Sequence, residues 1–215
     1  MTAEFWSTLL FSVSLVSVSI ILILSLFATM REGFQFWPPP ERKSWQHRSF
    51  LILFRCFVYP LIVLSALQFD IGNSAVRYLA IGIGIILLIA GFVLAIRITL
   101  QMGWRNAFGE KRGLVTDGYF SRSRNPVYVA TWLGLIGWAV VANSVLVSIL
   151  LGFWAALYLF APLFEEPWLE KMYGYEIFQR VKELSDEKIL LKDGSLYPAL
   201  QKMTKDGLLT YKEEY

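Results

Sequence analysis

The chain has 215 residues, of which 56% are hydrophobic, 17% charged and 16% aromatic. Soluble domains carry about 25% charged residues, so this composition excludes an ordinary soluble enzyme and a disordered chain. The single cysteine and single histidine exclude a disulfide scaffold and the usual zinc ligand sets, and we expect no metal site. The remaining class is an all-α polytopic membrane protein.

Five apolar segments predict five transmembrane helices, because about 20 apolar residues cross a bilayer core. They cover about 5–29, 49–68, 78–97, 127–141 and 145–163. The last two divide a charge-free run at Ala142-Asn143-Ser144, a turn signal, and predict a tight C-terminal hairpin. Its first helix is short enough to tilt or to lie partly at the interface. Gly82 and Gly84 in the third span predict close helix packing rather than a nucleotide-binding loop.

Charge divides the chain near residue 165. Residues 1–164 hold 12 Lys/Arg and 6 Asp/Glu, whereas residues 165–215 hold 8 and 11. The basic residues of the first part gather in loops 31–48 and 97–124, which the positive-inside rule places in the cytoplasm. We therefore expect a multi-pass membrane protein whose N-terminus is outside and whose solvated tail is cytoplasmic. Arg55 interrupts the second span, and we favour a structural role in which it snorkels to the surface.

Polar groups at the cytoplasmic ends of the spans are the functional candidates. If 127–163 is a hairpin, its ends meet, and Arg124 and Asn125 face the neighbouring Glu165 and Glu166. One interpretation is a structural Arg–Glu clamp. The other is a ligand site, in which the glutamates bind an ammonium and a sulfonium group while Arg124 or helix-start amides bind a carboxylate.

Several motifs in residues 101–174 occur together. They are Met102-Gly103-Trp104-Arg105, Gly113–Gly118, Arg124-Asn125-Pro126-Val127-Tyr128, Glu165-Glu166-Pro167-Trp168-Leu169 and Tyr173-Gly174. In this order, around an apolar hairpin, they resemble the isoprenylcysteine carboxyl methyltransferase and phospholipid methyltransferase superfamily. Trp37-Pro38-Pro39-Pro40 is similar to the first loop of bacterial members, which favours a bacterial inner membrane over the endoplasmic reticulum.

The resemblance implies a membrane methyltransferase domain over 1–174, with S-adenosylmethionine as cofactor. The methyl acceptor would be lipidic or a small hydrophobic molecule, such as a prenylcysteine carboxylate or a phospholipid amine. Many members have His where this chain has Asn125, which weakens the prenylcysteine assignment. The implied catalytic residues are Arg124, Asn125 and Glu166. The implied cofactor-binding residues are Leu114, Val115, Gly118, Arg124, Asn125, Pro126, Tyr128, Glu165 and Glu166.

The tail resembles a different family. Tyr173–Ile177, Gly194–Leu200 and Lys205–Leu209 are similar to PadR-type winged-helix regulators. Apolar spacing predicts helices over 175–184 and 195–205 and a strand over 208–215, so we expect a small cytoplasmic helix-turn-helix-like fragment over 175–215. Its negative charge argues against nucleic-acid binding. A natural fusion, a gene-model join and an engineered chimera all stay open.

The runner-up function is a non-enzymatic membrane anchor that displays this helix-turn-helix-like tail as a regulatory or interaction module. Membrane lipids are partners under either function. The oligomeric state and the acceptor atom have no signal in the sequence.

Overall fold

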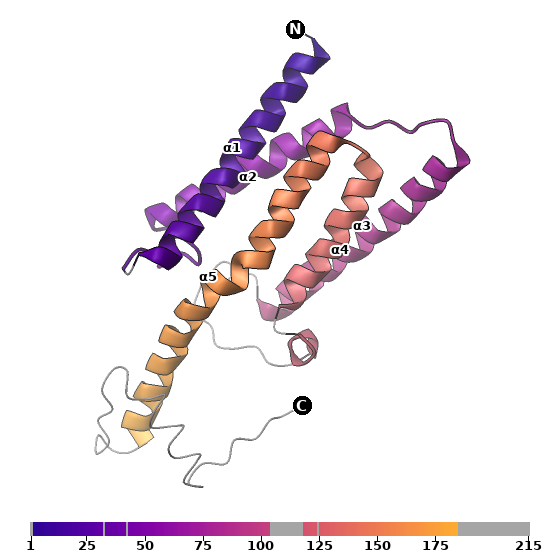
Figure 1. Ribbon diagram of the computed structural model, residues 1–215. Helices are drawn as coiled ribbons and strands as arrows, with labels where there is room; N and C mark the ends of the chain where they lie inside the picture. The colour runs from indigo at the N-terminus through magenta and orange to yellow at the C-terminus, as the bar shows by residue number, and fades with distance from the viewer. Residues whose placement is uncertain (1, 32, 42, 104–117, 124, 185–215) are drawn as a thin grey trace. The chain divides into compact units, whose positions relative to one another are not determined.

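The computed structural model describes residues 2–31, 33–41, 43–103, 118–123 and 125–184, and every regular element in these ranges is helical. The elements are α1 (Ala3–Met30), α2 (Trp45–Leu67), α3 (Ala75–Met102), the short 3-10 helix η2 (Gly118–Ser121), α4 (Pro126–Ala142) and α5 (Val145–Leu184). Contacts divide the chain into two compact units, Met1–Phe164 and Glu165–Tyr215. The first unit holds α1 to α4 and the apolar part of α5 (Figure 1).

Each of the five predicted spans corresponds to a helix. Among the described residues, four helices are long and apolar enough to cross a membrane: α1, α2, α3 and the Val145–Glu165 part of α5. The fifth, α4, has 17 residues and is about 25 Å long, which is less than the bilayer core of about 30 Å. The expectation of a short first hairpin helix is therefore confirmed, and α4 does not qualify as a full span by length.

The predicted end of the fifth helix at residue 163 is wrong. Helix α5 continues without a break to Leu184 and includes the predicted tail helix 175–184. The onset of charge at Glu165 marks the end of the apolar surface, whereas the backbone hydrogen bonds of a helix do not depend on side-chain polarity. The predicted helix 195–205 and strand 208–215 lie outside the described residues.

The helices of the first unit pack as two pairs, α1 with α2 and α3 with α4 (Figure 1). In the first pair, α1 buries a stripe of mostly small residues at helical spacing: Ser14, Ser17, Val18, Ile21 and Ser25. The Ser14 hydroxyl donates a hydrogen bond of 3.0 Å to the Phe57 carbonyl of α2. This bond satisfies a buried hydroxyl that would otherwise be costly between two apolar helices.

Glycines bring α3 and α4 into backbone contact. A Cβ added to Gly91 of α3 would overlap the Gly134 backbone of α4, 2.6 Å from its Cα. A Cβ on Gly84 would lie 3.1 Å from the Gly137 carbonyl oxygen. The prediction of close packing is thus confirmed for Gly84, while Gly82 faces open space.

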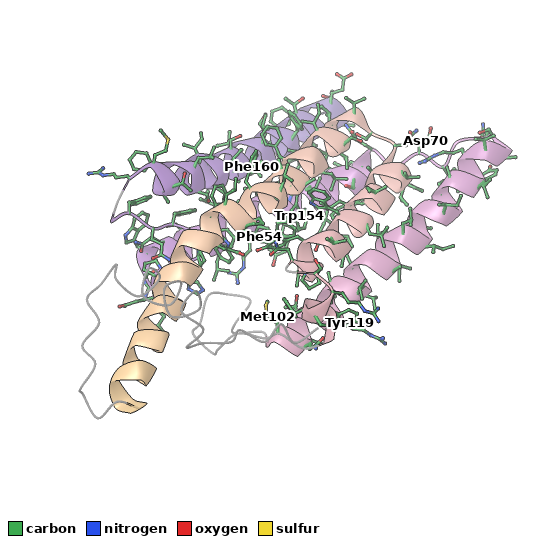
Figure 2. All side chains as sticks on the ribbon, turned by 60° about the horizontal axis from the view of Figure 1, so that its bottom comes forward. Phe54, Asp70, Met102, Tyr119, Trp154 and Phe160 are labelled. Atoms are coloured by element: carbon green, nitrogen blue, oxygen red, sulfur yellow. The ribbon has the colours of Figure 1, made fainter. Side chains whose placement is uncertain are left out.

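Aromatic rings fill the interior between α2, α3, α4 and α5. Trp154 of α5 is only 6% exposed and lies at its centre, beside Phe54 in Figure 2. Its ring centroid is 5.5 Å from those of Phe54 and Phe57 and 6.3 Å from those of Phe92 and Trp138. The contacts with Phe54, Phe57 and Trp138 are edge-to-face and that with Phe92 is tilted. Aromatic contacts of this kind are favourable beyond the area they bury, and they fix α5 against three neighbouring helices.

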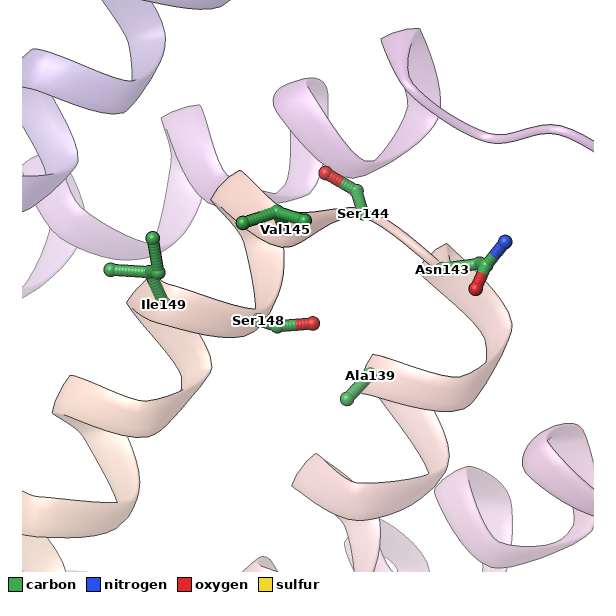
Figure 3. Close-up of a pocket in the computed structure, with 6 residues that line it drawn as sticks. All are labelled: Ala139, Asn143, Ser144, Val145, Ser148 and Ile149. Atoms are coloured by element: carbon green, nitrogen blue, oxygen red, sulfur yellow. The ribbon is translucent and has the colours of Figure 1, made fainter.

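The turn between α4 and α5 falls where the sequence predicts it. Asn143 adopts the left-handed conformation with a φ of 48°, and its N–H bonds the Ala139 carbonyl. The Ser144 hydroxyl donates to the Gln68 side-chain oxygen and also accepts from the Val147 N–H. Figure 3 shows a small pocket at this turn, lined by Ala139, Asn143, Ser144, Val145, Ser148 and Ile149. It lies at the opposite end of α4 from the predicted site.

Arg77 at the start of α3 closes the same end of the hairpin. Its guanidinium donates hydrogen bonds of 2.7 Å to the carbonyls of Val140 and Val141, which are in the last turn of α4. A helix leaves its last four carbonyls without partners and carries partial negative charge there, so a cation is well placed. Nearby, the Trp138 indole donates to the Ser65 hydroxyl of α2 at 3.0 Å.

Candidate functional site

The predicted site residues fall into three groups in the structure. Gly118, Asn125, Pro126 and Tyr128 lie in the first unit, at η2 and at the start of α4. Glu165 and Glu166 are consecutive residues of α5 at the start of the second unit. Leu114, Val115 and Arg124 lie outside the described residues.

Asn125 is the N-cap residue of α4, but its side chain makes no capping hydrogen bond. Its carbonyl accepts from the N–H groups of Tyr128 at 3.2 Å and Val129 at 3.3 Å, and its own N–H donates to the Ser123 hydroxyl at 3.3 Å. An asparagine in this position normally accepts a bond from the first turn. The half-buried side-chain amide of Asn125 is therefore not used to start the helix.

Pro126 explains how α4 can begin without that bond. It is buried at the first helical position, where its fixed φ suits a helix and its missing N–H removes one unpaired donor. The start of α4 is thus set by the backbone of Pro126 rather than by the side chain of Asn125.

Tyr128 contacts α5 across the hairpin. Its ring centroid is 4.8 Å from that of Tyr158 at an interplanar angle of 42°, and Tyr158 in turn lies 6.3 Å from Trp154. One turn beyond Tyr128, the Trp132 indole donates to the Ala155 carbonyl at 3.2 Å. The hairpin is therefore joined close to the predicted site, with two half-buried phenol rings side by side.

Sequence reasoning missed Tyr158. The usable signal is its spacing, because Tyr158 precedes Glu165 in the sequence by seven residues, the interval of about two helical turns. The expectation that the two glutamates act as one pair stays a prediction.

Gly118 and the rest of η2 pack against α3 and α4. Gly118 has a φ of +66°, and a Cβ there would overlap the side-chain amide of Gln101 near the end of α3. Phe120 packs on a small cluster of Ala95, Ile98 and Ala130. A glycine is favoured at this position by its positive φ, which other residues rarely adopt. The contact fixes the segment that leads into Asn125.

The predicted meeting of Arg124 and Asn125 with Glu165 and Glu166 stays a prediction. Arg124 is outside the described part of the chain, and the glutamates open the second unit. The structure places Asn125 and Tyr128 at the start of α4, with Tyr158 of α5 beside Tyr128. The four residues predicted to meet form either a structural clamp or a ligand site, and the function of the domain decides between the two interpretations.

The fold and the site together define a helical membrane protein whose polar candidate residues lie at one end of an apolar hairpin. Residues 79–176 match the phospholipid methyltransferase family, and residues 168–215 match the PadR-like family of transcriptional regulators. Both resemblances read from the sequence are confirmed. The first match spans every predicted site residue and supports a membrane methyltransferase, so the anchor alternative is not favoured.

The two family matches overlap over residues 168–176, within the single helix α5. The predicted domain boundary at 174 falls in this overlap and stays a prediction. No curated protein and no solved structure matches the chain.

Proposed function

We propose that this protein transfers a methyl group from S-adenosylmethionine to a lipidic or small hydrophobic acceptor. The match of residues 79–176 to the phospholipid methyltransferase family supports the reaction class. The observation that carries the site is the unused Asn125 amide at the start of α4, beside the Tyr128–Tyr158 pair. A polar group that does not serve the fold, at the edge of an apolar hairpin, suits a ligand better than a structural clamp.

The chemistry of these residues fits a ligand with a carboxylate, an ammonium and a sulfonium. In this proposal Asn125 and Arg124 bind and orient the carboxylate, and Glu165 and Glu166 bind the ammonium. The tyrosine rings offer π faces to a cation, an attraction of about 0.5–2 kcal/mol. When bound, S-adenosylmethionine supplies an electrophilic methyl group on sulfur.

Methyl transfer from a sulfonium depends mainly on alignment and on the exclusion of water. The half-buried Tyr128 and Tyr158 exclude water from one side of the candidate site. Leu114, Val115, Gly118 and Pro126 complete the proposed cofactor-binding set. An apolar acceptor would reach this site laterally from the lipid, which explains a methyltransferase inside a membrane.

Calorimetric titration of S-adenosylmethionine into the detergent-solubilised protein tests the site. Glu166→Ala and Glu165→Ala should each abolish or strongly weaken binding, while Glu4→Ala, at the exposed start of α1, should not change it. Wild-type affinity in both glutamate variants would remove them from the site. Labelled methyl transfer into a lipid extract, with the products identified, then reports the acceptor.

The same experiments decide the alternative. A protein that binds no cofactor and methylates no component of the extract would instead be an anchor for its PadR-like segment. The proposed cellular setting is a bacterial inner membrane with the basic loops and the tail in the cytoplasm. Reporter fusions at each loop would test that orientation.

A further inference from the structure

We propose that the outward face of α2 binds the head group of an anionic phospholipid through Arg55. Arg48, Ile52, Arg55 and Tyr59 follow one another at intervals of four, three and four residues, so they form one stripe along the helix. All four side chains are exposed, with Ile52 at 59% and Tyr59 at 63%. The stripe is therefore exposed on the surface of the first unit.

Arg55 lies well inside the apolar helix. It follows Trp45, the first residue of α2, by ten positions, or about 15 Å along the axis. Its guanidinium makes no hydrogen bond or ion pair with any residue of the described ranges. An unpaired guanidinium at such a depth on a membrane helix is costly and needs an anion or a route to the surface.

The geometry of α2 provides a route to the surface. Helical side chains tilt toward the N-terminus of their helix, so Arg55 extends toward Arg48, which is one heptad or about 10 Å earlier. Arg48 marks the level at which the helix meets polar surroundings. The two guanidinium groups thus approach one head-group level from the same face of α2.

The shape of the stripe favours a lipid over a free anion. A guanidinium binds a phosphate through two parallel N–H···O bonds. Beyond Arg55 the exposed surface of α2 is apolar and includes Tyr59, Ile62 and Val63. An anionic head with acyl chains matches this order of cation and apolar surface, whereas inorganic phosphate uses only the cation. A zwitterionic head group would add a positive charge beside two arginines.

Arg97 of α3 provides a matched control. It is also exposed on a membrane helix, where the neighbouring Ile96 and Leu100 of α3 are exposed too. Its guanidinium forms no hydrogen bond or ion pair with any of the described residues. However, it lies five residues before Met102, the end of α3, and has no second arginine one heptad away. It should reach water without a lipid.

The test uses the full chain in mixed micelles with equal amounts of phosphatidylglycerol and phosphatidylcholine, and native mass spectrometry counts the lipids retained. We expect the wild type to retain phosphatidylglycerol preferentially. Arg55→Gln should reduce that retention about five-fold, the effect of one basic residue near a charged surface. Arg55→Lys should keep part of it, and Arg97→Gln should resemble the wild type.

A wild type without preference for phosphatidylglycerol would overturn the proposal, as would wild-type retention in Arg55→Gln. Displacement of the lipid by excess inorganic phosphate would show a simple anion site and would also overturn it. A second assay keeps Arg55 in place, so that misfolding of a substituted variant cannot affect its result. Cys56 is the only cysteine, is exposed and adjoins Arg55, so a fluorophore on it should be quenched more by head-group-labelled phosphatidylglycerol than by labelled phosphatidylcholine. Equal quenching would contradict the proposal.

Discussion

The two ends of helix α4 differ in how their polar groups are used. At the C-terminal end, Arg77 bonds the carbonyls of Val140 and Val141, and Ser144 bonds Gln68. At the N-terminal end, the natural capping side chain, Asn125, makes no capping bond. The turn end uses its side chains in hydrogen bonds between helices, whereas the Asn125 side chain makes no capping bond. The difference teaches that polar side chains hold the turn end of the hairpin, whereas the other end is held by the Tyr128–Tyr158 ring contact and the Trp132–Ala155 hydrogen bond, so Asn125 itself should contribute little to stability.

The largest effect should come from breaking the contact that both ends share, between α3 and α4. Gly91→Ala forces a methyl group into the Gly134 backbone, and overpacking against a backbone should lower the free energy of unfolding by about 3 kcal/mol. Thermal unfolding in detergent measures it. Gly82→Ala is the matched control, because nothing lies within 4 Å of its Cβ position. Equal stability of the two variants would contradict the close packing of α3 and α4.

Arg77→Gln should weaken the turn end alone. It removes charge-assisted hydrogen bonds to two carbonyls of α4. A hydrogen bond to a charged group contributes about 1.5–3 kcal/mol. We therefore expect the free energy of unfolding to fall by about 2 kcal/mol. The affinity for S-adenosylmethionine should stay unchanged in the folded fraction. A variant that is stable but binds the cofactor poorly would show that the two ends are coupled.

Asn125→Ala should give the opposite result. Stability should change by less than about 0.5 kcal/mol, since no capping bond is lost. Cofactor affinity should fall about ten-fold, the equivalent of one neutral hydrogen bond. Asn125→Asp sharpens the test, because an aspartate favours a helix start but repels the carboxylate of the cofactor. An Asn125→Ala protein that is clearly destabilised and binds normally would make Asn125 a structural cap.

The smallest effect concerns the Tyr128–Tyr158 contact. A double-mutant cycle with Tyr128→Leu and Tyr158→Leu should give a coupling energy of about 0.5–1.5 kcal/mol, as expected of an aromatic pair. Unfolding of the two single variants and the double variant measures it. Tyr158→Phe keeps the ring and should retain the coupling. A coupling energy near zero would mean that the rings touch without holding the hairpin together.

The sequence predicted most of the fold because each membrane helix corresponds to a long run of apolar residues. Apolar runs located all five helices, and Asn143 located the turn, since its αL conformation suits few other residues. The sequence did not predict that α5 continues to Leu184, because a change in polarity resembles a helix end. In an all-apolar run, periodicity gives no contrast, and therefore Tyr158 could not be recognised as the partner of Tyr128.

The candidate site was predictable only as a set of residue types. The unused amide of Asn125 and the closeness of Gly118 to Gln101 depend on atomic positions that no spacing rule gives. Arg77, at the turn end of the hairpin and outside the candidate site, shows the same limit for the fold. Its partners in α4 are 63 and 64 residues away and are backbone oxygens. The sequence therefore contains no side chain by which this contact could be recognised.

That last contact has an evolutionary consequence. Because Arg77 bonds main-chain oxygens, every amino acid at positions 140 and 141 would present it with the same acceptors. Related chains can therefore vary these two positions without a compensating change at residue 77. Conservation of Arg77 alone would preserve this contact. Methods that detect contacts from correlated substitutions would therefore not find it.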